Sequence, residues 1–379
     1  MRLTVWKPGL CVWAGGAALL LAACASTPLP PLNTRAPVVV TATVAPPAPP
    51  SPMLFPSLTP PPLQNRTPEP TLTPAPVLRP LTSGGCCVQP AFSPDGSQVW
   101  YVDKPDVSQP AGLWAVPVLG GPPAFVTDRL GIFSPDGTLV AYPQAGDTYI
   151  ERWATGERWR VPAAGRAVAF SPDGTQIAWQ TASSSINFDR RRVDLWVAAV
   201  DGSDARLVIS LVGGGLAGWF PDGRLLATGS LKLNDPALIL AVTPATGDAV
   251  EIAPAAHVRG LLLSPAGGWL AYQVSFSGDA AQDGLWLRPL AGGEPKRAPV
   301  FGAYRWRAEG RLLVVPLEAV GGSQRLVEVD AATGAAANLT DPRVTAFRIA
   351  AGDWDLAPDG RRLVFVNAAD HNVWLLELP

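Results

Sequence analysis

Ser93-Pro94-Asp95-Gly96 is the first of three intact copies of one tetrapeptide, and the others are Ser134-Pro135-Asp136-Gly137 and Ser171-Pro172-Asp173-Gly174. Altered copies follow at residues 220–223, 264–267, 307–310 and 357–360, and the third positions of successive copies are 37 to 50 residues apart. A repeat of roughly 40–50 residues with strand-like flanks is typical of a β-propeller rather than of a helical solenoid.

The residue types of the motif explain its conformation. Proline presets φ at the second turn position, aspartate bonds its own backbone, and glycine accepts the positive φ that other residues resist. We therefore expect the aspartates to be structural and to lie one per repeat around one rim: Asp95, Asp136, Asp173, Asp222 and Asp359.

Short apolar runs flank each turn, and a further run with Leu-Trp at its centre follows, as at Leu113-Trp114 and Leu195-Trp196. Four antiparallel strands per repeat make a sheet that can be buried only between its neighbours. The sequence therefore predicts an all-β, seven-bladed propeller with four-stranded blades. Six blades remain the alternative if the copy near Gly310 is a distorted insertion.

The chain also contains a segment that can close the ring. After the last turn only the apolar runs 363–366 and 373–376 remain before the sequence stops at Pro379, so the last blade lacks an outer strand. A similar run precedes the first blade at residues 78–82. We predict that residues 78–82 pair with the last blade.

These turns and Leu-Trp strands resemble the TolB-like propeller repeats, a group related to WD-repeat proteins, over about residues 78–379. The resemblance implies the fold. It implies little about function, because such propellers occur as binding scaffolds, as envelope proteins and as the non-catalytic half of peptidases. The last four copies depart from the motif.

The N-terminal 23 residues have the pattern of an export signal. Arg2 and Lys7 precede an apolar stretch from Leu10 to Leu21 that is too short to span a membrane. Leu21-Ala22-Ala23-Cys24 is similar to the lipobox of bacterial lipoproteins, which implies cleavage before Cys24 and its lipidation. An ordinary secretory signal cut nearby is the alternative. The expected location is extracytoplasmic, lipid-anchored to the cell membrane, and in the outer membrane if the organism has one.

Residues 24–77 differ sharply in composition from the repeats. Proline pairs and triplets such as Pro30-Pro31 and Pro60-Pro61-Pro62 alternate with Thr, Ala, Ser and Leu. Such a stretch cannot bury a core and favours extended conformations. We therefore predict three parts: a signal peptide (1–23), a disordered Pro/Thr-rich linker (24–77) and the propeller (78–379).

The charge balance and the cysteines restrict the function. Loss of Arg2 and Lys7 with the signal would change the net charge from −2 to −4, which indicates neither nucleic acid nor an anionic membrane surface as a partner. Two cysteines remain in the propeller, Cys86 and Cys87. A bridge between adjacent cysteines is strained, so two partly buried thiols are expected, with the vicinal bridge as the alternative.

Candidate catalytic residues are scarce. His257 and His371 lie more than two repeats apart, no His or Cys cluster has zinc-site spacing, and no nucleophile elbow occurs. Gly213-Gly214-Gly215 lacks the context of a phosphate loop and is interpreted as a turn between blades. We predict no enzymatic activity, no cofactor and no metal.

The connections between second and third strands vary most, at residues 103–112, 181–192, 229–236 and 275–284. Function on a rigid scaffold tends to lie on such loops. The candidate binding loop combines an aromatic ring with three guanidinium groups, in the sequence Asn187, Phe188, Asp189, Arg190, Arg191 and Arg192. It could bind an acidic partner or a glycan, or it could be a solvated hairpin tip.

The sequence therefore predicts a membrane-anchored, monomeric, non-catalytic head that binds a protein or an envelope polymer. The alternative is an enzyme that uses the propeller channel, such as a glycan hydrolase, a lyase or a quinone-dependent dehydrogenase. Two carboxylates that converge in the channel with Arg or His would favour the enzyme.

Overall fold

The computed structural model describes residues 76–379, apart from 107, 109–110 and 185–186. In this part of the chain the regular elements are β-strands and one three-residue 3₁₀ helix, η1 (Phe188–Arg190), so the predicted all-β propeller fold is confirmed. None of the described helices has the length and apolar character needed to span a bilayer. The predicted signal peptide, Cys24 and nearly all of the predicted linker lie outside the described residues.

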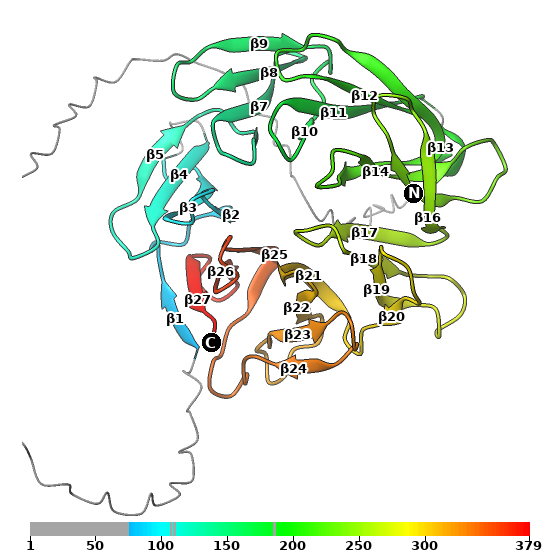
Figure 1. Cartoon of the computed structure of the whole chain (residues 1–379). Coiled ribbons are helices and arrows are strands. Elements are labelled where there is room, and N and C mark those ends of the chain that lie inside the picture. Colours follow the sequence, from blue (N-terminus) through cyan, green and yellow to red (C-terminus); the bar gives the residue numbers. More distant parts are fainter. Residues whose placement is uncertain (1–75, 107, 109–110, 185–186) are drawn as a thin grey trace, which may run out of the picture. The chain divides into compact units, whose positions relative to one another are not determined.

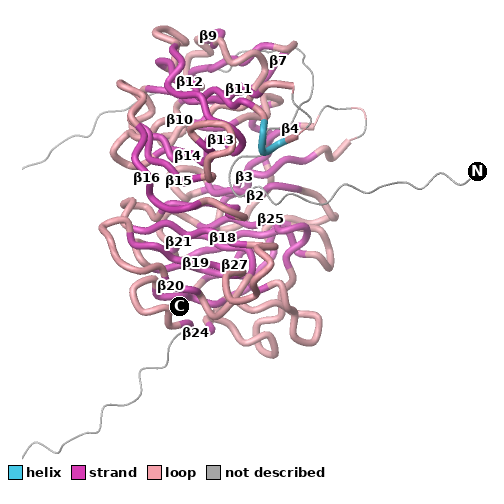
Figure 2. The backbone as a smooth tube through the Cα atoms, turned by 90° about the vertical axis from the view of Figure 1, so that its right-hand side faces the viewer, coloured by secondary structure: helices cyan, strands magenta, loops and turns pink. Residues whose placement is uncertain are grey.

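Five of the sheets are four-stranded blades, which Figure 1 shows around a common centre and Figure 2 shows from the side. The first is β2 (Val88–Phe92), β3 (Gln98–Asp103), β4 (Gly112–Pro117) and β5 (Ala124–Thr127). The second is β6 (Ile132–Phe133), β7 (Leu139–Gln144), β8 (Asp147–Arg152) and β9 (Arg158–Val161). The third four-stranded blade is β17 (Val258–Leu263), β18 (Trp269–Val274), β19 (Gly284–Pro289) and β20 (Lys296–Arg297). The fourth is β21 (Gly302–Ala308), β22 (Arg311–Pro316), β23 (Val327–Asp330) and β24 (Ala336–Asn338). The fifth contains β25 (Ile349–Leu356), β26 (Arg362–Asn367), β27 (Val373–Glu377) and β1 (Val77–Pro80).

The prediction of seven four-stranded blades is wrong, because the structure has five, and the third and fourth repeats form one seven-stranded sheet. Its strands are β10 (Ala169–Phe170), β11 (Gln176–Ala182), β12 (Arg192–Ala199), β13 (Arg206–Trp219), β14 (Leu225–Ser230), β15 (Leu238–Val242) and β16 (Ala249–Pro254). The long strand β13 pairs with β12 through its first half and with β14 through its second half.

Three successive glycines of β13, at positions 213–215, explain this fusion. Gly213 and Gly214 have φ of 68° and 62°, and the pairing with β14 shifts register between Val212 and Gly215. A side chain at Gly214 would collide with the backbone carbonyl of Thr228. The glycines therefore form an irregularity within a continuous strand rather than the turn that the sequence predicts.

Residues near the start of the described chain close the ring as predicted. β1 pairs antiparallel with β27, with Val77 opposite Glu377 and Pro80 opposite Trp374. The contact continues through Leu81, whose N–H donates to the Val373 carbonyl at 2.8 Å. The Val373 N–H in turn donates to Thr82 Oγ1 at 2.9 Å. We call this junction between the last and first blades the seam.

The core lies between neighbouring sheets, as the two apolar faces of each repeat predict. At the seam Tyr101 and Val116 pack with Val364 and Leu375. The interface between the first and second blades has a different composition. Trp100 lies 4.7 Å from Phe133 between ring centroids, and Glu151 binds both Arg129 (2.8 Å) and the Tyr142 hydroxyl (2.7 Å).

The fifth repeat turn obtains its carboxylate from the next blade. Ala266 occupies the position of the motif aspartate. Glu309, from the sixth turn, accepts hydrogen bonds from Ser264 Oγ at 2.8 Å and from the N–H groups of Ala266 and Gly268 at 2.8 and 3.1 Å. A residue 43 positions later in the sequence therefore replaces the missing side chain.

Candidate functional site

The predicted binding loop forms the short helix η1 and its flanks. Asn187 caps the helix by accepting the N–H of Asp189 at 3.0 Å. Phe188 is 54% exposed, and the Arg191 guanidinium carbon lies 3.9 Å from the centre of its ring. The aromatic ring and one arginine of the predicted cluster are therefore in contact.

The three arginines do not converge on one point. Arg192 pairs with Asp194 at 2.7 Å and donates to Ser210 Oγ at 3.0 Å. Arg190 contacts Asn234 Oδ1 at 3.4 Å, on the following variable loop. Since Asp194 neutralises one of the three charges, the structure favours an acidic partner less than the sequence does. The loop remains a predicted binding site.

The turn aspartates bond within their own turns. Asp95 accepts from Ser93 Oγ at 2.6 Å and from the Ser97 N–H and hydroxyl at 3.0 and 2.7 Å. These bonds, the one from Ser93 above all, lower the pKa of Asp95 to about 2. Asp136 and Asp173 accept the same set of bonds, and Asp222 and Asp359 accept from arginines of their own turns.

The two histidines lie in loops, His257 before β17 and His371 between β26 and β27. Among the described residues, the one group of three side chains placed to hold a metal ion is Cys86, Cys87 and Asp103. Cys86 and Cys87 form a disulfide. The expected pair of thiols is therefore wrong, and in this state the two sulfurs are not thiolate ligands.

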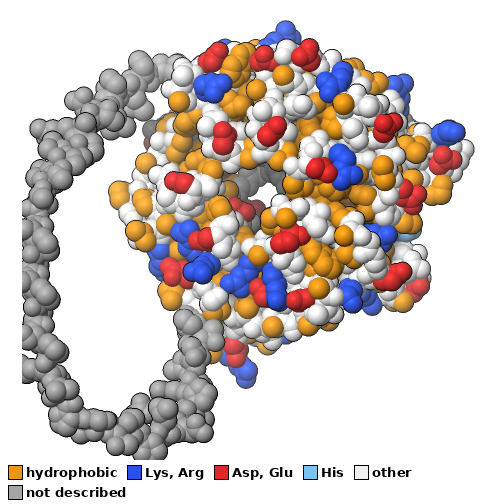
Figure 3. Space-filling view, in the orientation of Figure 1, with side chains coloured by type: hydrophobic (Ala, Val, Ile, Leu, Met, Phe, Trp, Pro, Cys, Tyr) orange, Lys and Arg blue, Asp and Glu red, His pale blue; other side chains and the backbone are white. Residues whose placement is uncertain are grey.

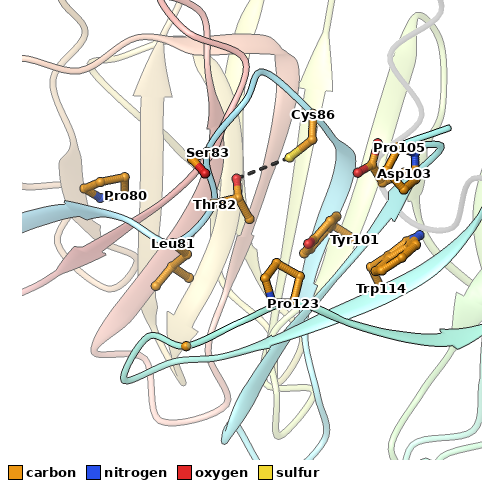
Figure 4. A pocket seen from close by; sticks show the side chains of 11 residues that line it. Pro80, Leu81, Thr82, Ser83, Cys86, Tyr101, Asp103, Pro105, Trp114 and Pro123 are labelled. Carbon is orange, nitrogen blue, oxygen red and sulfur yellow. Dashed lines mark hydrogen bonds between the residues drawn. The ribbon is translucent and has the colours of Figure 1, made fainter.

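A pocket of about 470 Å³ lies at the seam, and Figure 4 shows its lining residues. It is formed by the segment after β1, by strands β3 and β4, and by their adjoining loops. The lining residues are Pro80, Leu81, Thr82, Ser83, Cys86, Tyr101, Asp103, Pro105, Trp114, Gly121 and Pro123. We call it the seam pocket.

Oxygen atoms provide most of the polar groups among these side chains. Asp103 is half-buried, and its Oδ1 accepts the Lys104 N–H at 2.7 Å. Thr82 and Ser83 contribute hydroxyl groups, and Thr82 Oγ1 also lies 3.2 Å from Cys86 Sγ. Burial, with a smaller contribution from the Asp103 charge, raises the pKa of Tyr101 to about 12, so its phenol is neutral at physiological pH.

Trp114 contributes a large aromatic surface to the pocket. Its ring meets Phe125 edge to face, with centroids 5.5 Å apart. The indole Nε1 is buried and has no hydrogen-bond partner among the described residues. A buried donor without a partner costs roughly 1–3 kcal/mol.

A second cluster lies where β21 and β25 approach β2, near the central opening that Figure 3 shows. Asp353 Oδ2 accepts the Gln89 N–H at 3.2 Å, and Asp355 Oδ2 accepts the Phe92 N–H at 3.1 Å. Arg305 lies over the Trp354 ring at 5.0 Å. Burial raises the pKa of Asp355, although the Arg305 charge opposes this shift. We call Arg305, Asp353 and Asp355 the inner-strand cluster.

The sequence analysis identified neither site. One signal for the seam pocket was present, because Asp103 and Pro105 belong to the first of the variable loops. The other lining residues come from residues 80–86 and 101–123, which ring closure brings together. The inner-strand cluster contains the residue types that the enzyme alternative requires, two carboxylates and an arginine, and the charges of Asp355 and Arg305 interact.

No protein-family model matches the sequence, and no curated protein matches it. Solved structures do. An oligogalacturonate lyase in complex with manganese matches with a TM-score of 0.58 and 14% identity, over 80% of this chain and 93% of that one. The acylaminoacyl peptidase of Pyrococcus horikoshii matches with a TM-score of 0.52 and 14% identity, over 74% of this chain and 49% of that one. A putative TolB from Agrobacterium tumefaciens matches with a TM-score of 0.41 and 17% identity, over 67% and 91% of the two chains.

At these identities the matches with TM-scores above 0.5 show the propeller fold, which the resemblance to TolB-like repeats implied. They also overturn the prediction that the chain is not an enzyme. That prediction relied on the scarcity of recognisable catalytic residues, yet the same fold belongs to an oligogalacturonate lyase that matches over 93% of its length.

Proposed function

We propose that this chain is an exported, lipid-anchored propeller that recognises a polysaccharide of the cell envelope in the seam pocket. The observation that carries the proposal is the pairing of an aromatic surface, Trp114, with the oxygen acceptors of Asp103, Thr82 and Ser83 in one cavity. Export and the lipid anchor depend on the sequence around Cys24.

The size of the pocket supports a small ring system or the end of a polymer. Ligand sites typically occupy roughly 300–1,000 Å³ and combine an apolar lining with a few polar groups. The seam pocket has this volume, about 470 Å³, and this mixture of side chains. The candidate loop at Asn187–Arg192 lacks a comparable set of converging groups, because its arginines have separate partners.

Retention of envelope polysaccharides on the immobilised protein tests the proposal. Trp114→Ala should abolish most of the retention, because it removes the aromatic surface. Trp153→Ala is the matched control, since Trp153 is a partly exposed tryptophan of the second blade that does not line the pocket. The triple variant Arg190→Ala, Arg191→Ala, Arg192→Ala should keep binding. If only the triple variant loses it, the candidate loop is the site and the seam pocket is not.

Catalysis on a polysaccharide is the second candidate function, and the inner-strand cluster favours it. A buried carboxyl with a raised pKa beside a second carboxylate is a pattern that carbohydrate-cleaving enzymes use. The fold shared with an oligogalacturonate lyase supports the same class.

Product analysis separates the two candidates. If the chain cleaves a polymer, mass spectrometry should show shortened products, and Asp355→Asn and Asp353→Asn should each remove them. Asp106→Asn, an exposed acid on the loop after β3, serves as the control. Undegraded polymer that is still retained by the protein supports recognition alone.

A further inference from the structure

We propose that the seam pocket takes an uncharged sugar ring, one face of which packs on Trp114 while its hydroxyl groups donate to Asp103. This inference rests on the proposed function and adds the class of ligand. It follows from the charges and hydrogen-bonding groups that line the cavity.

The apolar lining suits the C–H face of a sugar. Trp114, Tyr101 and Pro123 lie along one side of the view in Figure 4, with Thr82 and Cys86 across from them. The disulfide keeps the Cys86 sulfur in the form of a small apolar group next to Thr82. Aromatic rings give apolar contact at low conformational cost.

Charge restricts the ligand further. Asp103 is the one acidic side chain among the pocket-lining residues, and none of those residues is Lys or Arg. Two basic residues adjoin lining residues in the sequence: Arg79, whose guanidinium contacts Glu377 and the Val118 carbonyl, and Lys104, which is exposed. A uronate placed here would bring a second negative charge close to Asp103, and like charges at such short range repel. The pocket therefore disfavours galacturonate, the sugar acid named for the structurally similar lyase.

A proline-rich peptide is the competing ligand, because Trp and Tyr grooves also bind polyproline helices. Such a peptide offers few N–H donors, since proline has none. Asp103, Thr82 and Ser83 would then lose their solvation without gaining donors. Sugar hydroxyls supply those donors, so the lining favours a carbohydrate.

Saturation-transfer NMR and calorimetry with defined ligands test this inference. The probes are neutral oligomers of glucose and of N-acetylglucosamine, an oligogalacturonate, and a proline-rich peptide. We expect binding of a neutral oligomer that is insensitive to salt. Asp103→Ala should weaken it roughly tenfold, which corresponds to the loss of a charge-assisted hydrogen bond. Asp106→Ala should leave it unchanged, because Asp106 lies on the same loop but outside the pocket lining.

The sign of a second substitution distinguishes the outcomes. Asp103→Asn should weaken a neutral sugar, whereas it should strengthen a uronate by removing repulsion. Preferred binding of the oligogalacturonate or of the peptide overturns the inference. If an envelope polysaccharide is retained in a Trp114-dependent way but Asp103→Ala has no effect, the proposed function stands and the ligand class assigned here is wrong.

Discussion

In the first three repeats each Ser-Pro-Asp-Gly turn is completed by its own aspartate, whereas in the fifth repeat the carboxylate comes from Glu309 of the next blade. The later repeats contain further contacts of this kind. Asp355 reaches the backbone of β2, and Arg307 donates to the Gly360 and Pro379 carbonyls. Where the motif aspartate is kept, it holds the turn locally, even in altered copies such as those of Asp222 and Asp359. Where the aspartate is lost, as at Ala266, a carboxylate from the next blade holds the turn.

The last blade shows the longest-range contact of this kind, because its outer strand, β1, comes from the other end of the described chain. Deletion of residues 78–82 should therefore have the largest effect. It removes the edge partner of β27 and the buried Leu81, and should lower the melting temperature by roughly 10 °C or more. Circular dichroism melts measure this change. A five-residue deletion at 40–44 is the control, and equal melting of both variants would show that β1 does not hold the ring.

Glu309→Ala should have the next largest effect. It removes the acceptor of three hydrogen bonds at the fifth turn, and because the site is exposed we expect a loss of about 1 kcal/mol in the free energy of unfolding.

Ala266→Asp sharpens this comparison, because it restores the motif aspartate. In the Glu309→Ala background Ala266→Asp should recover most of the lost free energy of unfolding. In the wild type it should not raise the free energy of unfolding, since two carboxylates would then compete for the same hydrogen-bond donors of the turn. A double-mutant cycle in urea measures the coupling. Additive effects would mean that Glu309 does not replace the aspartate.

The carboxylate of Asp355 should give a smaller effect with a defined sign. Burial raises its folded-state pKa above the usual 3.8, so the folded state holds the proton more tightly than the unfolded state. Stability that depends on this group is then present at low pH and falls as the pH rises through the folded-state pKa. Urea unfolding should show Asp355→Asn gaining stability relative to wild type as the pH rises above about 4. If the free energies of unfolding of Asp355→Asn and wild type differed by the same amount at all pH values, the pKa of Asp355 would not be raised in the folded state.

Asp95 should show the opposite slope and the smallest effect, because it is exposed. Its pKa is lowered to about 2 in the folded state, so its contribution is present above about 4 and lost as the pH falls towards 2. Asp95→Asn should be less stable than wild type at neutral pH, and the two should converge in acid. If the free energy of unfolding changed with pH in the same direction in both comparisons, the carboxylate that bonds within its own turn (Asp95) and the carboxylate that bonds to another blade (Asp355) would not differ as described.

The sequence predicts those features that a comparison of the repeats with one another reveals. Turn spacing identifies the propeller, and the missing outer strand of the last repeat identifies residues 78–82 as its partner. The fused sheet was not predictable in this way. Three successive glycines allow both a turn and a strand irregularity, and the choice depends on the pairing of Gly215 with Thr228 in β14.

The candidate site was less predictable for the same reason. Asp103, Trp114 and Thr82 meet because the ring closes, and no local spacing records that contact. The disulfide illustrates a different limit. Because Cys86 and Cys87 are adjacent in the sequence, a bridge between them is expected to be strained. In the structure, however, Cys87 has a φ of 92°. Its loop is tied to the last blade by hydrogen bonds that involve Thr82 and Asn372, so these surroundings set the backbone conformation.

Hydrogen exchange of the full chain with and without a neutral envelope oligosaccharide tests the central claim most directly. Saccharide recognition in the seam pocket predicts slower exchange in peptides that cover residues 80–87 and 101–114, with no change at 187–192. Protection confined to 187–192, or to the inner strands at 349–356, would contradict it and would place the ligand at the candidate loop or at the inner-strand cluster.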